Sequence, residues 1–216
     1  MASTEEITQT LRSHYERAFR AHGPTGKGVD WGEKMADLAC RYDKMAAVMP
    51  LRAPGPVSLL DVGCGFGGLL DHLLTRGIAV DYTGIDVVSD MIASARERHP
   101  GTRFILGDIF GASDIGQYDY LVCNGILTQK LDVPGAEMDE FANLLIRRMF
   151  SLCRIGIAFN VMTTKVNYFS NNLYYRSPAE LFAWCLAELT RHIRIDHAYW
   201  LYEYTMYLYR TPTDRT

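Results

Sequence analysis

The sequence predicts an α/β fold, a doubly wound and mostly parallel sheet with helices on both faces. Three observations support this prediction. From Val57 onward, short apolar runs alternate with stretches of helical length, as expected for right-handed strand–helix–strand crossovers. A glycine-rich turn follows the first apolar run. The chain then ends in two β-rich runs with almost nothing between them, and these must pair antiparallel because a parallel pair needs a long crossover.

The predicted core covers residues 57–216, and residues 1–56 form a helical lid of the same single domain. Strands are expected at Val57–Val62, Tyr82–Ile85, Arg103–Leu106, Tyr118–Cys123 and Ile155–Val161, and helices at Gly68–Arg76, Asp90–Arg98, Met138–Cys153 and Pro178–Thr190. The closing hairpin is expected to use His192–Tyr199 and Tyr202–Arg210.

Two helices are expected in the lid. Thr4 to Ala21 carries apolar residues at helical spacing, and Ser3 followed three residues later by Glu6 is typical of a capping box. A glycine-rich segment, residues 22–28, ends this helix. The second helix is expected from about Trp31 to Met49.

Bulk properties restrict the class of protein. The net charge is −3 at pH 7, and phosphate binding needs clustered Lys and Arg, so no nucleic-acid partner is expected. The five cysteines form no CxxC pair and are expected to be buried, without disulfides or a metal site. Residues 1–20 lack the apolar core of a signal peptide, and no run is long enough to span a bilayer. We therefore expect a cytoplasmic monomer or homodimer without a membrane partner.

The most informative segment is Leu59–Gly68, which reads LLDVGCGFGG. Its glycines let the backbone turn sharply after a strand and bring the amide groups of the next helix close to a ligand. Gly63, Gly65 and Gly68 also satisfy the GxGxxG pattern of dinucleotide sites. The glycines alone therefore suit two kinds of cofactor.

Three aspartates at successive strand ends distinguish between these cofactors. Asp61 precedes the glycines, where a carboxylate suits a cationic amino group and repels a pyrophosphate. Asp86 ends the next strand and is placed to accept hydrogen bonds from both hydroxyls of a ribose. Asp108 follows the third strand, where it suits an adenine amino group while Ile109 packs against the ring. Three acids in this order favour an adenosine cofactor that carries an amino group.

The series DVGCGFG (Asp61 to Gly67), Asp86 and Gly107-Asp108 resembles the motifs of class I S-adenosylmethionine-dependent methyltransferases. The resemblance implies a Rossmann-like sheet of seven strands ending in an antiparallel hairpin. It also implies S-adenosyl-L-methionine as the cofactor and S-adenosyl-L-homocysteine as the product. The cofactor contacts that it implies are Asp61, Gly63, Cys64, Gly65, Gly67, Asp86, Val87, Met91, Asp108, Ile109, Asn124 and Gly125.

The acceptor site is expected at the carboxyl ends of the strands. His22, in the glycine-rich segment, is the candidate general base, and Asn124 is the second candidate catalytic residue. Arg41 is expected either to pair with the methionine carboxylate of the cofactor or to lie solvated on its helix. Trp31 is expected either to stack over the site or to anchor the core. The candidate substrate contacts are Tyr15, His22, Asn160, Tyr168, Tyr174 and Arg176.

The leading functional hypothesis is methyl transfer to oxygen or nitrogen of a small-molecule metabolite or natural-product intermediate. The segment Cys123–Ile126 lacks the signature of DNA and protein-amide methylases, and little chain remains for a docking domain. Three alternatives stay open. They are an NAD(P)-dependent oxidoreductase that uses the same glycines, aminopropyl transfer from the same cofactor, and a non-catalytic S-adenosylmethionine-binding partner subunit.

Overall fold

A computed structural model describes residues 2–50, 55–112 and 115–213 of the chain. Its strands are β1 (Val57–Val62), β2 (Val80–Asp86), β3 (Arg103–Leu106), β4 (Tyr118–Cys123), β5 (Cys153–Thr163), β6 (Tyr175–Arg176), β7 (His192–Asp196) and β8 (Glu203–Tyr209). Its helices are α1 (Thr4–His22), α2 (Met35–Ala46), α3 (Gly68–Thr75), α4 (Ser89–Arg98), α5 (Gly135–Leu152) and α6 (Pro178–Glu188), with short 3-10 helices η1 (Lys27–Val29) and η2 (Ile126–Thr128).

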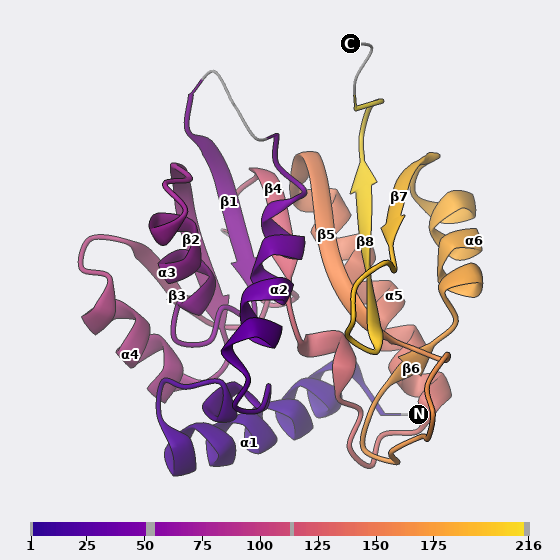
Figure 1. Cartoon of the computed structure of the whole chain (residues 1–216), viewed down its shortest axis with the longest axis horizontal. Coiled ribbons are helices and arrows are strands. Elements are labelled where there is room, and N and C mark those ends of the chain that lie inside the picture. Colours follow the sequence, from indigo (N-terminus) through magenta and orange to yellow (C-terminus); the bar gives the residue numbers. More distant parts are fainter. Residues whose placement is uncertain (1, 51–54, 113–114, 214–216) are drawn as a thin grey trace.

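The strands form one mixed sheet in the order β3-β2-β1-β4-β5-β8-β7 (Figure 1). β8 runs antiparallel to β5 and β7, whereas β1 to β5 pair in parallel. This arrangement confirms the predicted Rossmann-like, mostly parallel sheet with an antiparallel hairpin at its end. The two-residue strand β6 lies outside the path and pairs with β5, which the sequence did not predict.

Helices cover both faces because side chains along each strand alternate between two cores. Leu60 and Leu121 point to the core shared with α5 and α6, while Leu59 and Val122 point to the core shared with α2, α3 and α4. The terminal strand divides in the same way, and every residue of β8 is buried. All five cysteines are free and buried, as predicted.

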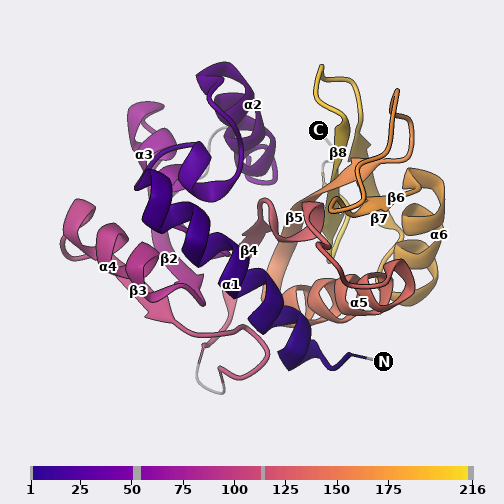
Figure 2. The ribbon, with the colours of Figure 1, turned by 90° about the horizontal axis from the view of Figure 1, so that it is seen from below.

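The first helix is held in place by its ends and by its apolar face. The Ser3 hydroxyl accepts the amide hydrogen of Glu6 (3.2 Å), and the Ser3 amide donates to the Glu6 carboxylate (2.7 Å), which confirms the capping box. Ile7 and Leu11 join the core that includes α5. As a result α1 crosses the carboxyl edge of the sheet, from α5 to α4 (Figure 2).

The second predicted helix begins later than expected. The segment from Trp31 to Lys34 is not helical, and α2 starts only at Met35. Asp30 (φ 60°) and Gly32 (φ 76°) adopt left-handed conformations on either side of Trp31, and such residues interrupt a right-handed helix. Trp31 and its neighbours therefore lie in a non-helical connection between η1 and α2.

The closing hairpin is also more open than expected. β7 ends at Asp196, whose carboxylate accepts the amide hydrogen of Ala198 (3.1 Å) in a local turn, so residues 197–202 form a loop. The hydroxyl of Tyr199 lies 2.9 Å from the hydroxyl of Thr205, and this hydrogen bond connects the loop to β8. Within the described ranges, no helix combines the length and apolar character needed to cross a membrane.

Candidate active site

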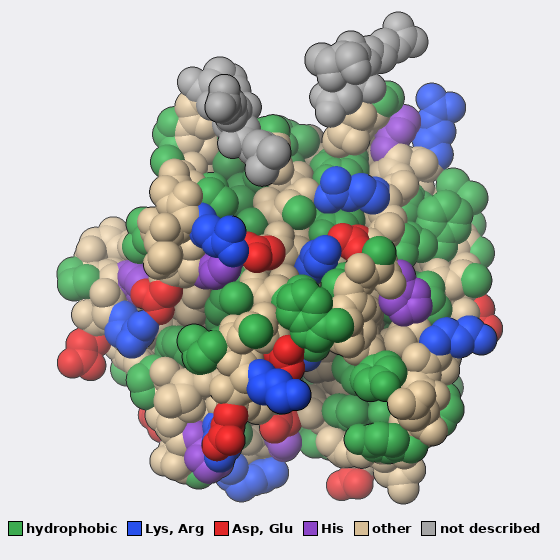
Figure 3. Space-filling view, in the orientation of Figure 1, with side chains coloured by type: hydrophobic (Ala, Val, Ile, Leu, Met, Phe, Trp, Pro, Cys, Tyr) green, Lys and Arg blue, Asp and Glu red, His purple; other side chains and the backbone are tan. Residues whose placement is uncertain are grey.

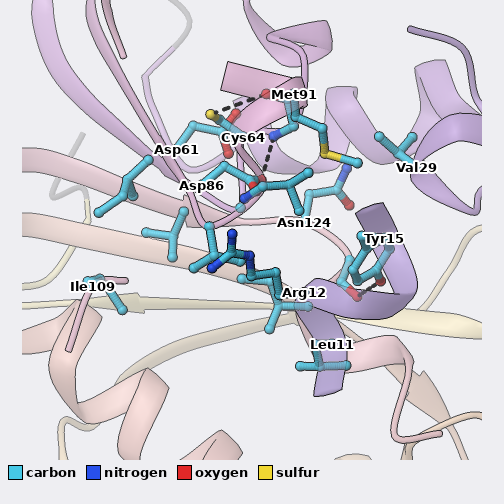
Figure 4. Close-up of a pocket in the computed structure, with 18 of the residues that line it drawn as sticks. Leu11, Arg12, Tyr15, Val29, Asp61, Cys64, Asp86, Met91, Ile109 and Asn124 are labelled. Atoms are coloured by element: carbon cyan, nitrogen blue, oxygen red, sulfur yellow. Dashed lines mark hydrogen bonds between the residues drawn. The ribbon is translucent and has the colours of Figure 1, made fainter. Parts of the chain in front are cut away.

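A cavity lies between α1 and the carboxyl ends of β1, β2 and β4 (Figure 4). About 1010 Å³ of space is unoccupied by protein atoms there, the open mouth and adjoining solvent included. The predicted site residues in its lining are Tyr15, Trp31, Asp61, Gly63, Cys64, Gly65, Asp86, Val87, Met91, Asp108, Ile109, Asn124 and Gly125. The structure therefore brings together nearly all the residues that the sequence motifs selected for the cofactor.

The glycine turn is a tight loop tied to the neighbouring strand. The amides of Gly63 and Cys64 both donate to the carbonyl of Ile85, at 2.9 and 3.1 Å. Gly63 (φ 76°) and Gly65 (φ 54°) are left-handed, and a Cβ at Gly65 would lie 3.3 Å from the Val29 side chain. Only glycine adopts this backbone without strain, so the turn exposes its backbone to the cavity.

Asp86 is buried beneath this turn at the end of β2. One carboxylate oxygen accepts the amide hydrogen of Gly65 (2.9 Å), and the other accepts that of Val88 (2.8 Å). Burial raises the pKa of Asp86, while the backbone donors lower it. Each oxygen keeps a free lone pair, because a carboxylate oxygen can accept two hydrogen bonds. The residue can thus receive two further donors from a ligand.

Asp61 is a second buried carboxyl in the lining, 2% exposed. The hydroxyl of Tyr82 donates to it at 2.6 Å. Burial raises the pKa of Asp61 to about 7, against the effect of the tyrosine hydrogen bond. A ligand that brings a positive charge next to this carboxyl would favour its ionised form.

The third aspartate lies at the far end of the cavity, after β3. Asp108 accepts the amide hydrogen of Phe110 (2.9 Å), which fixes the turn around Ile109. Ile109 is buried, and with Val87 it gives this part of the cavity apolar walls. Met91 is buried in the lining beside the glycine turn.

The loop after β4 forms the wall nearest to α1. The carbonyl of Gly125 accepts hydrogen bonds from the hydroxyls of Tyr15 (3.3 Å) and Thr128 (2.6 Å). The side-chain oxygen of Asn124 is buried and has no partner among the described residues. Burial raises the pKa of Tyr15, so its phenol stays protonated and acts as a hydrogen-bond donor. The Asn124 oxygen is therefore free to accept from a ligand, while the Tyr15 hydroxyl, which donates to Gly125, keeps acceptor capacity.

A buried polar chain supports this loop from behind. The amide of Gly125 donates to Asn160 (2.9 Å), and the amide group of Asn160 donates to the carboxylate of Glu203 (2.7 Å). The other Glu203 oxygen lies 2.7 Å from Nε of Arg41 in an ion pair. The Arg41 guanidinium stacks on Trp31 at 3.8 Å, and the Trp31 ring packs against Gly125. The chain thus links α2 to the loop after β4.

This chain gives Arg41 a different position from either sequence expectation. Its side chain is 12% exposed and pairs with Glu203, so it neither faces the cavity nor lies solvated. The physical reason is that Glu203, 1% exposed on β8, needs a compensating positive charge. Trp31 lines the cavity and stacks on the Arg41 guanidinium, but it is only half-buried and belongs to none of the buried core clusters, so it does not anchor the core.

Other predicted residues lie away from the cavity lining. His22 is exposed in the last turn of α1, because the helix continues through it and ends only at Gly23. Tyr168 is 78% exposed, and Gly67 begins α3 behind the turn. The remaining residues outside the lining are Asn160, Tyr174 and Arg176.

Tyr174 and Arg176 pack against α5 instead. The Tyr174 hydroxyl donates to Asp139 (2.6 Å), and the Arg176 guanidinium donates to Asn143 (2.8 Å). Both partners are on the outer part of α5, so these side chains fasten β6 to that helix. Sequence reasoning assigned them to the substrate because an aromatic and polar segment after a central strand has the composition of a binding loop.

Sequence reasoning also missed several lining residues. Leu11 and Arg12 come from α1, and Phe141 and Leu145 from α5. The helical spacing of Leu11 and Tyr15 was visible in the sequence, but it indicated a buried face without saying what that face covers.

The carboxyl edge of this mixed sheet carries a glycine turn and three aspartates at successive strand ends. Together they define a site for an adenosine-type cofactor. Comparison with known proteins leads to the same class. The family model described as "Methyltransferase domain" matches residues 59–147. A Mycobacterium tuberculosis protein named as a methyltransferase is 34% identical over 158 residues, which are 72% of this chain and 95% of that protein.

Two further similarities extend this result. The Streptomyces fradiae dTDP-3-amino-3,6-dideoxy-alpha-D-glucopyranose N,N-dimethyltransferase is 38% identical over 84 residues, or 39% of this chain and 29% of that enzyme. The solved DhpI–SAH complex has the same fold, with a TM-score of 0.64 and 18% identity, covering 98% of this chain and all of that one. The chain belongs to the class I S-adenosylmethionine-dependent methyltransferases, and S-adenosylmethionine is its cofactor.

Proposed function

We propose that this enzyme transfers the methyl group to an oxygen or nitrogen atom of a small molecule. The observation that supports this most is the wall formed by α1. Leu11, Arg12 and Tyr15 line the cavity together with the glycine turn, so an acceptor has to fit within the enclosed space. On the face in Figure 3, acidic and basic side chains are interspersed, unlike the basic patch that a nucleic-acid substrate requires.

The three aspartates hold the cofactor in this proposal. Asp61 pairs with the amino group of the methionine part, and Asp86 accepts from the two ribose hydroxyls with its free lone pairs. Asp108 accepts from the adenine amino group, between the apolar walls of Val87 and Ile109. The residues fit the cofactor because its amino group, its ribose hydroxyls and its adenine amino group each meet a carboxylate that can accept a hydrogen bond.

S-adenosylmethionine, when bound, supplies a methyl group attached to a positively charged sulfur. The acceptor lone pair attacks that methyl group in line, and the sulfur is the leaving group. The described residues around the cavity include no histidine and no lysine. Burial raises the pKa of Cys64 well above its ordinary value, so that thiol stays neutral. Asp61, whose pKa is about 7, pairs with the cofactor amino group in this proposal and is not assigned to the acceptor. We therefore infer an acceptor atom that is already nucleophilic, such as a carboxylate oxygen or a neutral amine nitrogen.

Tyr15 and Asn124 orient the acceptor in this proposal. The Tyr15 hydroxyl, which donates to the Gly125 carbonyl and can still accept a hydrogen bond, and the unpartnered Asn124 oxygen both line the cavity at this loop. The S. fradiae relative, named for dimethylation of an amino sugar, supports a small acceptor.

The test is release of S-adenosylhomocysteine from S-adenosylmethionine in the presence of fractionated metabolite extracts, with mass detection of a product that gains one methyl group. Asp86→Asn serves as the inactive control. Tight cofactor binding without release in any fraction would indicate a non-catalytic partner subunit. Thermal stabilisation by NADH or NADPH but not by S-adenosylhomocysteine would indicate an oxidoreductase and overturn the proposal.

A further inference from the structure

Arg12 extends from α1 into the cavity without a protein partner (Figure 4). No hydrogen bond or ion pair joins it to any described residue, and its Nε atom is buried and unsatisfied. It is also the one Lys or Arg among the described residues that line the cavity. The acidic residues of the lining, Asp61, Asp86 and Asp108, form no ion pair with it.

Other partly buried arginines of the chain have a protein partner. Arg41 pairs with Glu203, Arg148 donates to the carbonyls of Ile109 (3.1 Å) and Ala112 (3.3 Å), and Arg210 donates to the carbonyl of Cys153 (3.2 Å). A buried cationic donor without an acceptor is costly, and folds generally avoid it. Arg41 also has buried nitrogens without a hydrogen bond, but it has the counter-charge of Glu203, whereas Arg12 has no acidic partner among the described residues and its side chain lines an open cavity.

We propose that Arg12 binds a carboxylate or phosphate group of the methyl acceptor; this rests on the proposed methyl transfer to a small molecule. The acceptor is thus a small organic anion. A guanidinium presents planar paired donors that match either group in a bidentate arrangement.

The position of Arg12 relative to Tyr15 supports the acceptor as its ligand. Residues three apart on a helix lie on the same face, about 5 Å along it. Tyr15 contacts the Gly125 loop, so an acceptor along α1 places its nucleophilic atom near Tyr15 and its anionic group one helical turn away. Leu11 and Ile126 supply apolar walls for the carbon skeleton between the two ends.

The carboxylate of the cofactor is the other anion to consider. The cofactor amino acid belongs at the end of the cavity formed by Asp61, the glycine turn and Tyr42. Arg12 also lines a second groove with Val87 and Asp108, the residues that the proposed binding mode places beside the adenine and away from the amino acid. This separation favours the acceptor over the cofactor as the ligand of Arg12.

The experiment uses the full chain saturated with S-adenosylhomocysteine, in the wild type and in Arg12→Met, Arg12→Lys and Arg17→Met. Arg17 is exposed on the same helix and gives the matched control. Each protein is titrated with citrate and, separately, with inorganic phosphate at constant ionic strength, and the thermal midpoint is followed. Citrate tests the carboxylate source and phosphate tests the phosphate source.

We expect at least one anion to raise the thermal midpoint of the wild type and of Arg17→Met by several degrees. The midpoint of Arg12→Lys should rise less, and that of Arg12→Met should not change. Equal stabilisation of Arg12→Met, or none of the wild type, overturns the proposal. A loss of S-adenosylhomocysteine affinity of more than about tenfold in Arg12→Met would assign Arg12 to the cofactor and also overturn it. Anion binding that depends on Arg12, without methyl transfer to any acceptor, would contradict only the proposed function.

Discussion

The buried ion pair between Arg41 and Glu203 allows a quantitative test of how the lid is fastened to the sheet. Glu203 is 1% exposed, and its two oxygens contact Arg41 and Asn160, each at 2.7 Å. Glu203→Leu leaves the guanidinium, 12% exposed, without its counter-charge. Removing one partner of such a pair costs about 3–5 kcal/mol of unfolding free energy. For a domain of this size that corresponds to a lower thermal midpoint by about 6–20 °C.

Calorimetry or circular dichroism measures this midpoint, and two further variants sharpen the result. The double variant Arg41→Met with Glu203→Leu removes both charges and should recover most of the loss, because an apolar pair of similar volume replaces the ion pair. Glu188→Gln breaks an exposed pair with Arg147, both side chains being more than 40% exposed, and should cost at most about 1 kcal/mol. A shift for Glu203→Leu no larger than that of Glu188→Gln would refute the reasoning.

Three further predictions concern the site. Asp86→Ala should weaken S-adenosylhomocysteine binding by about 2–3 kcal/mol in calorimetric titration, because charge-assisted hydrogen bonds are lost; unchanged affinity would remove Asp86 from its role. Cofactor affinity should rise as pH increases through about 7, the pKa of Asp61, since only the ionised carboxyl attracts the amino group; binding should be about tenfold weaker at pH 6 than at pH 8, and Asp61→Asn should abolish the dependence. His22→Ala should keep the turnover of the wild type, because the ring is exposed outside the cavity lining, and a large loss would restore it as the candidate base.

The fold was largely readable from local sequence. Arg103–Leu106 and Tyr118–Cys123 form strands with the predicted bounds, because each apolar run meets a glycine-containing turn at its carboxyl end. The start of α2 was misplaced, since the apolar spacing around Trp31 matches a helix but Asp30 and Gly32 turn the backbone left-handed. Local periodicity does not show whether a residue packs within a helix or from a loop.

The half of the site that binds the cofactor was predictable from the places where strands end in the sequence. Asp61, Asp86 and Asp108 lie at or just beyond the carboxyl ends of strands that meet at one edge of a parallel sheet, so their order in the chain gives their place in space. The acceptor half depends on contacts between distant segments. The partner of Arg41 is far along the chain on β8, and Arg12 reaches the cavity only because α1 crosses the sheet edge. No spacing within the sequence encodes either contact.

The crossing of α1 over the sheet edge has a kinetic consequence. Because Leu11, Arg12 and Tyr15 wall the cavity, a spent cofactor leaves, and a fresh one enters, most directly when this helix swings away. Its restraints are the stacked ring of Phe19 and the burial of Ile7, so opening breaks apolar contacts at both ends of one helix. We therefore expect the packing of these few residues to affect the rate of cofactor exchange, so that the helix which contacts the acceptor in the proposed function also controls access to the site.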